Sequence, residues 1–129
     1  MPDKLESELG QHLSDLQRRD TLKRELDKLV TAWHEAALDK AYSQEGVSRE
    51  DAAVLRSNSK ALEPQKRDAV LRALANRAVI EDSEPLPERE RFQEKQREFE
   101  AAEAGCRASW NQLRRPLMQH AYGGHVSWI

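Results

Sequence analysis

The sequence predicts an all-α protein, arranged as an elongated antiparallel three-helix bundle of coiled-coil-like character. Sixteen Ala and fifteen Leu stand among many Glu, Arg, Lys and Gln residues, and these side chains lose little conformational freedom in a helix. Apolar residues recur at steps of three and four, which is the spacing of one helix face. With five Gly, five Pro and one Cys, the composition excludes a collagen, a disulfide-rich miniprotein and an all-β sandwich.

The chain has the length of one domain, which we expect over residues 1–121, followed by a short C-terminal tail over residues 122–129. A compact sphere of this length has a radius of gyration of about 14 Å, whereas a helix of about 40 residues is roughly 60 Å long. Three such helices with short connections should run antiparallel as an elongated bundle. Breaks near residues 17–21 and 57–64 would instead give four or five shorter helices in a globule.

The first helix is expected over residues 3–43. Its apolar stripe advances by three or four residues except between Leu16 and Leu22, where the step is six. That step predicts either a shift of the stripe around a continuous helix or a break near residues 17–21 with a new N-cap. Gly46 then offers the left-handed conformation that commonly ends a helix.

The second helix is expected over residues 48–81. Ser48 as N-cap and Asp51 three residues later form a sequence close to a capping box. Within this segment, three small polar residues that favour turns are followed by Pro64, which disfavours a helical residue before it. We therefore expect a kink or a short break between residues 57 and 64.

The third helix is expected over residues 87–121, with Pro87 in its first turn. Pro116 should bend the last turns. Five residues of this helix, each seven positions after the one before, form a heptad-like seam. Cys106 is one of them and is therefore predicted to be buried. The seam consists of Phe92, Phe99, Cys106, Leu113 and His120.

Large apolar residues are scarce. Leu, Ile, Val and Phe together account for 25 of the 129 residues, close to the level below which a chain struggles to form a core. The net charge of −2 is too small to be typical of disorder. We therefore expect a second copy to complete the core, which would make the protein a homo-oligomer, most simply a dimer.

The sequence indicates a cytoplasmic protein without a membrane segment. A single cysteine excludes an internal disulfide. The N-terminal residues lack the apolar core of a signal peptide. The longest apolar stretches are far shorter than the roughly 20 residues that a membrane helix needs.

The sequence contains no complete catalytic motif. His34 and the following Glu begin like a zinc-protease helix, but Leu38 stands where the second histidine belongs. His120 and His125 have a spacing that is common by chance, and Cys106 has no histidine close in sequence. A glycine-rich phosphate loop is also missing. We therefore expect neither an enzyme, nor a cofactor, nor a metal site.

Charge is distributed unevenly along the chain. Residues 47–80 and 106–129 each carry a net charge of +3, whereas residues 1–46 carry −3 and residues 81–105 carry −5. One interpretation is that acidic and basic segments neutralise each other across antiparallel neighbours. The other is that the basic C-terminal region is exposed and meets an anionic partner.

The C-terminal region is the predicted partner-binding surface. Five of the seven aromatic residues lie in the last 38 positions, and three arginines lie in the last 24 positions. Aromatic residues and arginine are enriched at the centres of protein interfaces. Whether the tail belongs to the core or to the binding surface stays open. The predicted contact residues are Trp110, Arg114, Arg115, Tyr122 and Trp128.

These features predict a non-catalytic protein–protein interaction module, either an adaptor, an assembly factor or a regulator, which associates with itself and binds another protein. The alternative is a nucleic-acid-binding regulator with a helix-turn-helix-like segment over residues 48–80. A sequence pI of about 6.1 and the spread of basic residues around the helix argue against this alternative. Its phosphate-contacting residues would be Lys66, Arg67, Arg72 and Arg77.

Overall fold

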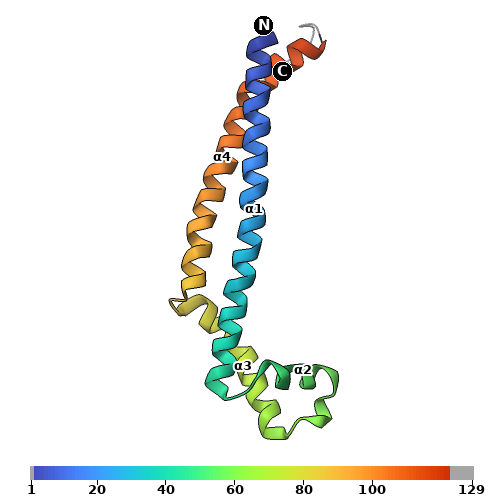
Figure 1. Ribbon diagram of the computed structural model, residues 1–129, viewed down its shortest axis with the longest axis vertical. Helices are drawn as coiled ribbons and strands as arrows, with labels where there is room; N and C mark the ends of the chain where they lie inside the picture. The colour runs from blue at the N-terminus through green and yellow to red at the C-terminus, as the bar shows by residue number, and fades with distance from the viewer. Residues whose placement is uncertain (1, 123–129) are drawn as a thin grey trace. The chain divides into compact units, whose positions relative to one another are not determined.

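The computed structural model describes residues 2–122 and is helical almost throughout (Figure 1). Over this range it contains four α-helices, one turn of 3-10 helix and no strand, which confirms the predicted all-α class. No helix in this part of the chain is both long enough and apolar enough to cross a membrane. In chain order the elements are α1 (Pro2–Glu45), α2 (Arg49–Ser57), η1 (Ser59–Ala61), α3 (Pro64–Ser83) and α4 (Pro87–Tyr122).

Helix α1 is uninterrupted, so the break considered near residues 17–21 is absent. Gln and Arg in this stretch are good helix formers, and they carry the helix across the six-residue step. The apolar stripe shifts around the helix instead, from half-buried Leu16 to buried Leu22. The helix ends as predicted at Gly46, whose φ of 68° lies in the left-handed region.

The expected second helix is divided into two. Ser48 and Asp51 form the predicted capping box, with each side chain accepting a hydrogen bond of 3.1 Å from the other residue's backbone N–H. Helix α2 ends at Ser57, and the extended Asn58 accepts a hydrogen bond from the backbone of Lys60 to start η1. Helix α3 then begins at Pro64. The break predicted between residues 57 and 64 is therefore confirmed.

Helix α4 begins at Pro87, as predicted, and continues through Pro116 to Tyr122. Because proline lacks a backbone N–H, one helical hydrogen bond is missing at Pro116. The helix axis changes direction near its C-terminal end in Figure 1. Cys106 is buried, in agreement with its heptad position.

The described residues pack as two compact units. One, the two-helix unit, combines α1 up to Leu26 with α4 from Glu94 onward. The other, the middle unit, comprises Asp27–Gln93. Its core brings together α1, α2 and α3 around Ala37, Ala41, Tyr42, Ala52, Leu62, Val70, Ala73, Ile80 and Leu86.

Candidate interaction surface

The two-helix unit is an antiparallel pair with a thin core. His12 of α1 contacts Ser109 of α4, and Glu25 of α1 contacts Lys95, so residue numbers run in opposite directions along the pair. Two helices supply few buried positions, because each helix faces only one neighbour. The buried residues of this unit are Leu5, Leu22, Leu26, Cys106, Ser109 and Leu113.

Trp110 lies at the edge of this core. Its side chain is 42% exposed, and its ring lies 5.5 Å from the ring of His12, centroid to centroid, at an angle of 39°. Leu13, the residue after His12, is 55% exposed. Both side chains therefore leave a large apolar surface in contact with water.

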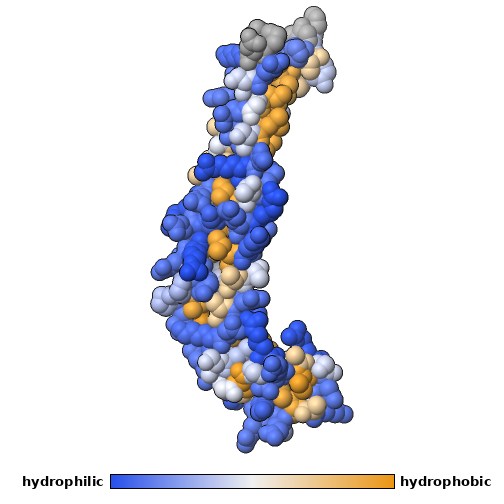
Figure 2. All heavy atoms as spheres, viewed as in Figure 1, coloured by the Kyte–Doolittle hydropathy of each residue, from blue (hydrophilic) through white to orange (hydrophobic). Residues whose placement is uncertain are grey.

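Other apolar residues extend this surface along both helices. Leu9 and Leu16 lie one turn on either side of Leu13, and Leu117 lies two turns after Trp110; all three are half-buried. On each helix, these residues are displaced around the helix axis from the buried residues, and the direction of displacement is the same on both helices. Because the helices are antiparallel, this direction places the residues of both helices on one side of the pair. We call this set the open face: Leu9, Leu13, Leu16, Trp110 and Leu117. Hydrophobic residues form a run over the two-helix unit near the top of Figure 2.

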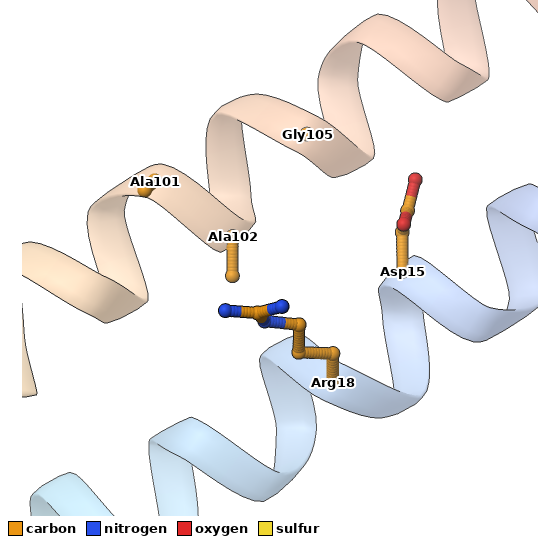
Figure 3. Close-up of a pocket in the computed structure, with 5 residues that line it drawn as sticks. All are labelled: Asp15, Arg18, Ala101, Ala102 and Gly105. Carbon is orange, nitrogen blue, oxygen red and sulfur yellow. The ribbon is translucent and has the colours of Figure 1, made fainter.

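A different part of the two-helix unit contains a pocket of about 280 Å³ (Figure 3). Asp15 and Arg18 of α1 line it opposite three small residues of α4. The guanidinium of Arg18 lies toward Ala102 in Figure 3. A single carboxylate and a single guanidinium beside small residues form no apolar enclosure, so we assign no ligand to this pocket.

The structure brings together two of the residues predicted for partner binding. Trp110 and Arg114 lie one turn apart on the same side of α4, and both are exposed. Arg115 is also exposed but lies about 100° further around the helix. Tyr122 is 58% exposed at the last described position. Trp128 lies outside the described residues.

Most of the basic residues predicted to contact nucleic acid have acidic neighbours in the middle unit. Lys66 lies 3.8 Å from Asp51, Arg72 lies 3.1 Å from Glu45 and Arg77 lies 3.1 Å from Glu81. Arg67 is half-buried, and no ion pair of its side chain is found among residues 2–122. A phosphate would therefore compete with a carboxylate at three of the four positions.

The ion pairs of the middle unit also join the oppositely charged segments of the sequence. Arg49 Nε donates to Asp39 Oδ1 over 2.6 Å, and this hydrogen bond raises the pKa of the Arg49 guanidinium. Arg72 of the basic segment 47–80 and Glu45 of the acidic segment 1–46 pair over 3.1 Å, across 27 positions of sequence. Exposed pairs of this kind each contribute little to stability. They do support the interpretation that the segments neutralise each other within the chain.

In the two-helix unit, Lys95 links both helices electrostatically. Its ammonium group lies 2.9 Å from Glu98 on α4 and 3.1 Å from Glu25 on α1. These two hydrogen bonds raise the pKa of Lys95, with Glu98 as the larger cause. Across the described range, no three His, Cys, Asp or Glu side chains are grouped so that they could hold a metal ion.

Comparisons of this chain with models of protein families, with curated proteins and with solved structures found no match.

The exposure of Leu13 was not expected from the sequence. Its helical spacing with Leu9 and Leu16 indicates a shared stripe, but spacing does not say how much of the stripe a neighbour covers. Leu5 and Leu13 are eight residues apart, which is only about 80° around the helix and no wider than the stripe that a globular helix commonly buries. No signal in the sequence therefore marks Leu13 as exposed.

Proposed function

We propose that the chain is a non-catalytic helical interaction module that associates with itself through the open face and serves as an adaptor, assembly factor or regulator. The observation that carries this proposal is the exposure of Leu13 and Trp110 on one side of a unit that has only two helices. Contiguous exposed apolar surface of this kind is typical of an interaction site.

A second copy is a suitable occupant on grounds of area. The two helices overlap over about 20 residues, or roughly 30 Å, and a pair of helices is about 20 Å wide. Such a face covers about 600 Å² per copy, or about 1,200 Å² in total, which is within the range of stable interfaces. Two pairs docked on this face would form a four-helix arrangement whose core contains Leu13 and Trp110.

The elongated, coiled-coil-like antiparallel bundle is part of the same proposal, because long helices with a narrow seam require side-by-side neighbours. We also propose a cytoplasmic location, on the basis of the single cysteine. Small-angle scattering with molecular mass would measure elongation and copy number together. A spherical monomer would contradict both.

The decisive test is the mass of the full chain in solution, measured by light scattering across a concentration series. We expect a dimer for the native sequence. Leu13→Glu would place two charges in the interface, and we expect it to weaken dimerisation by tenfold or more. Leu71→Glu is the matched control, since Leu71 is similarly exposed but belongs to α3 of the middle unit.

Helical circular dichroism of both variants should equal that of the native protein, because both side chains are half-exposed. A native chain that stays monomeric, or a Leu13→Glu variant that dimerises like the control, would overturn the proposal. Trp110→Glu provides an independent probe from the other helix and should act in the same direction.

The nucleic-acid alternative rests on four basic residues of α3, namely Lys66, Arg67, Arg72 and Arg77. Duplex DNA titrated at two salt concentrations is its test, because phosphate contacts make affinity fall steeply with salt. Our proposal predicts no salt-sensitive binding. Binding that is abolished by reversing the charges of Arg67 and Arg72 would favour the alternative.

A further inference from the structure

The middle unit contains an apolar surface that is separate from the open face. Three helices, α1, α2 and α3, line a pocket of about 390 Å³, a volume typical of ligand sites. Its walls include Leu38, Tyr42, Leu55 and Leu74, together with two arginines, Arg56 and Arg77.

The pocket opens from the core to an apolar rim. Tyr42 is buried at its base, whereas Leu38 and Leu55 are half-buried and Leu74 is 43% exposed. Leu71, one turn before Leu74 on α3, is also exposed and extends the apolar surface beyond the pocket. In Figure 2, hydrophobic residues gather on the part of the surface near the bottom of the view.

Arg56 adds positive charge to this apolar pocket, whereas the charge of Arg77 is balanced by Glu81. Arg56 lies in the last turn of α2 and is exposed, and no carboxylate pairs with it within the described range. Arg77 donates through Nε to Glu81, which also lies 2.6 Å from His34 Nδ1. A guanidinium has five N–H donors, so Arg77 keeps further donors for an incoming anion.

We propose that this pocket binds an acidic amphipathic helix of another protein. Large apolar side chains of that helix would fill the space between Leu38, Leu55 and Leu74, and carboxylates one turn away would pair with Arg56. Binding of an amphipathic helix in an apolar groove is a recurrent mode of recognition. Opposite charge at the rim gives the association its specificity.

A second copy of the chain is a poorer match for this pocket. Its most acidic stretch, residues 81–105, contains Leu86, Phe92 and Phe99 as large apolar side chains, and Leu86 is buried in the core of the middle unit. Phe92 already packs against Trp33, with 5.2 Å between the ring centroids, and Phe99 is half-buried. The acidic helix of this chain therefore has no large apolar side chain to spare.

A display library of helical peptides tests the proposal with the full-length protein. Leu, Phe or Met would be fixed at positions i, i+4 and i+7, and the flanking positions would vary among Glu, Gln and Lys. We expect enriched peptides to carry Glu at the flanks. Arg56→Glu should weaken them by tenfold or more and shift the enrichment toward Lys.

Two matched control variants distinguish binding in this pocket from nonspecific electrostatic binding and nonspecific hydrophobic binding. Lys60→Glu reverses an exposed charge in η1 outside the pocket, and Val79→Gln removes an exposed apolar side chain from another side of α3. Both should bind the enriched peptides as the native protein does, whereas Leu74→Gln should weaken binding by tenfold or more. Leu13→Glu should leave peptide binding unchanged, so loss of the dimer and loss of the pocket are distinguishable.

Enrichment without acidic flanks, or equal affinity of the native protein, Arg56→Glu and Leu74→Gln, would overturn the proposal. Binding of octanoate in the absence of any enriched peptide would overturn it as well, and would assign the pocket to a small amphipathic anion. Thermal melts of the variants should match the native melt, because the substituted side chains are exposed.

Discussion

His12 Nδ1 lies 2.8 Å from Ser109 Oγ, which joins two residues 97 positions apart in the chain. Ser109 also donates its hydroxyl proton to the carbonyl oxygen of Cys106 over 3.1 Å. Because a hydroxyl has one proton, the two contacts of Ser109 form together in the tautomer of His12 that carries its proton on Nδ1. This polar contact within a thin apolar core fixes the alignment of α1 with α4.

The coupling between these two residues should be measurable by a double-mutant cycle. We expect His12→Ala and Ser109→Ala each to lower the free energy of unfolding, and their coupling energy to be about 1 kcal/mol. Urea unfolding of the two single variants and the double variant checks this. Strictly additive effects would mean that the hydrogen bond does not form in solution.

Two glycines should respond oppositely to alanine. Gly46 has a φ of 68°, so Gly46→Ala should lower the free energy of unfolding by about 1 kcal/mol. Gly105 lies inside α4, where an added Cβ would meet nothing within 4 Å. Gly105→Ala should therefore raise the free energy of unfolding by roughly 0.5–1 kcal/mol. Denaturant midpoints of the two variants check the signs, and a shared sign would contradict the assigned helix end.

The capping box should make stability depend on acid pH. The backbone hydrogen bond from Ser48 lowers the pKa of Asp51 below its usual value of about 3.9, and nearby Lys66 adds to this. A carboxylate with a lowered folded-state pKa stabilises the fold above its unfolded pKa, and this contribution is lost as the pH falls through the folded pKa. The stability difference between the native protein and Asp51→Asn should therefore be largest above about pH 5 and shrink below about pH 4. A difference that is independent of pH would exclude this ionic contribution.

Trp33 packs as an aromatic ring without using its polar atom. Its ring stacks on His34 at 5.7 Å and 10°, and its buried Nε1 has no hydrogen-bond partner among the described residues. Trp33→Phe removes an unsatisfied donor and should change the free energy of unfolding by less than about 1 kcal/mol. Trp33→Ala should cost about 2 kcal/mol or more. Thermal or urea unfolding distinguishes the two, and equal losses would indicate that the indole N–H has an acceptor in solution.

Local features of the fold could be predicted because their causes are local. The capping box at Ser48, the left-handed Gly46 and the break before Pro64 each depend on backbone groups within a few residues. The course of α1 through residues 17–21 could not be decided in the same way. There, a register shift and a helix break leave similar apolar spacing, so the spacing alone does not distinguish them.

The sequence predicted only part of the candidate surfaces. Trp110 and Arg114 stand out because an aromatic residue and an arginine share one side of a helix. Leu13 and Arg56 do not stand out. Nothing near Leu13 in sequence shows that its side chain is exposed, and nothing near Arg56 shows that it lines a pocket. Their roles depend on residues from distant helices.

By itself, the sequence determined the helical class, the helix ends and the burial of Cys106, since propensity, capping and apolar period act over one or two turns. Only the tertiary structure decided which part of each apolar stripe is covered. It also decided which charges meet. Coverage and charge pairing depend on the neighbouring helix and its rotation, and one helix's own spacing carries no information about either.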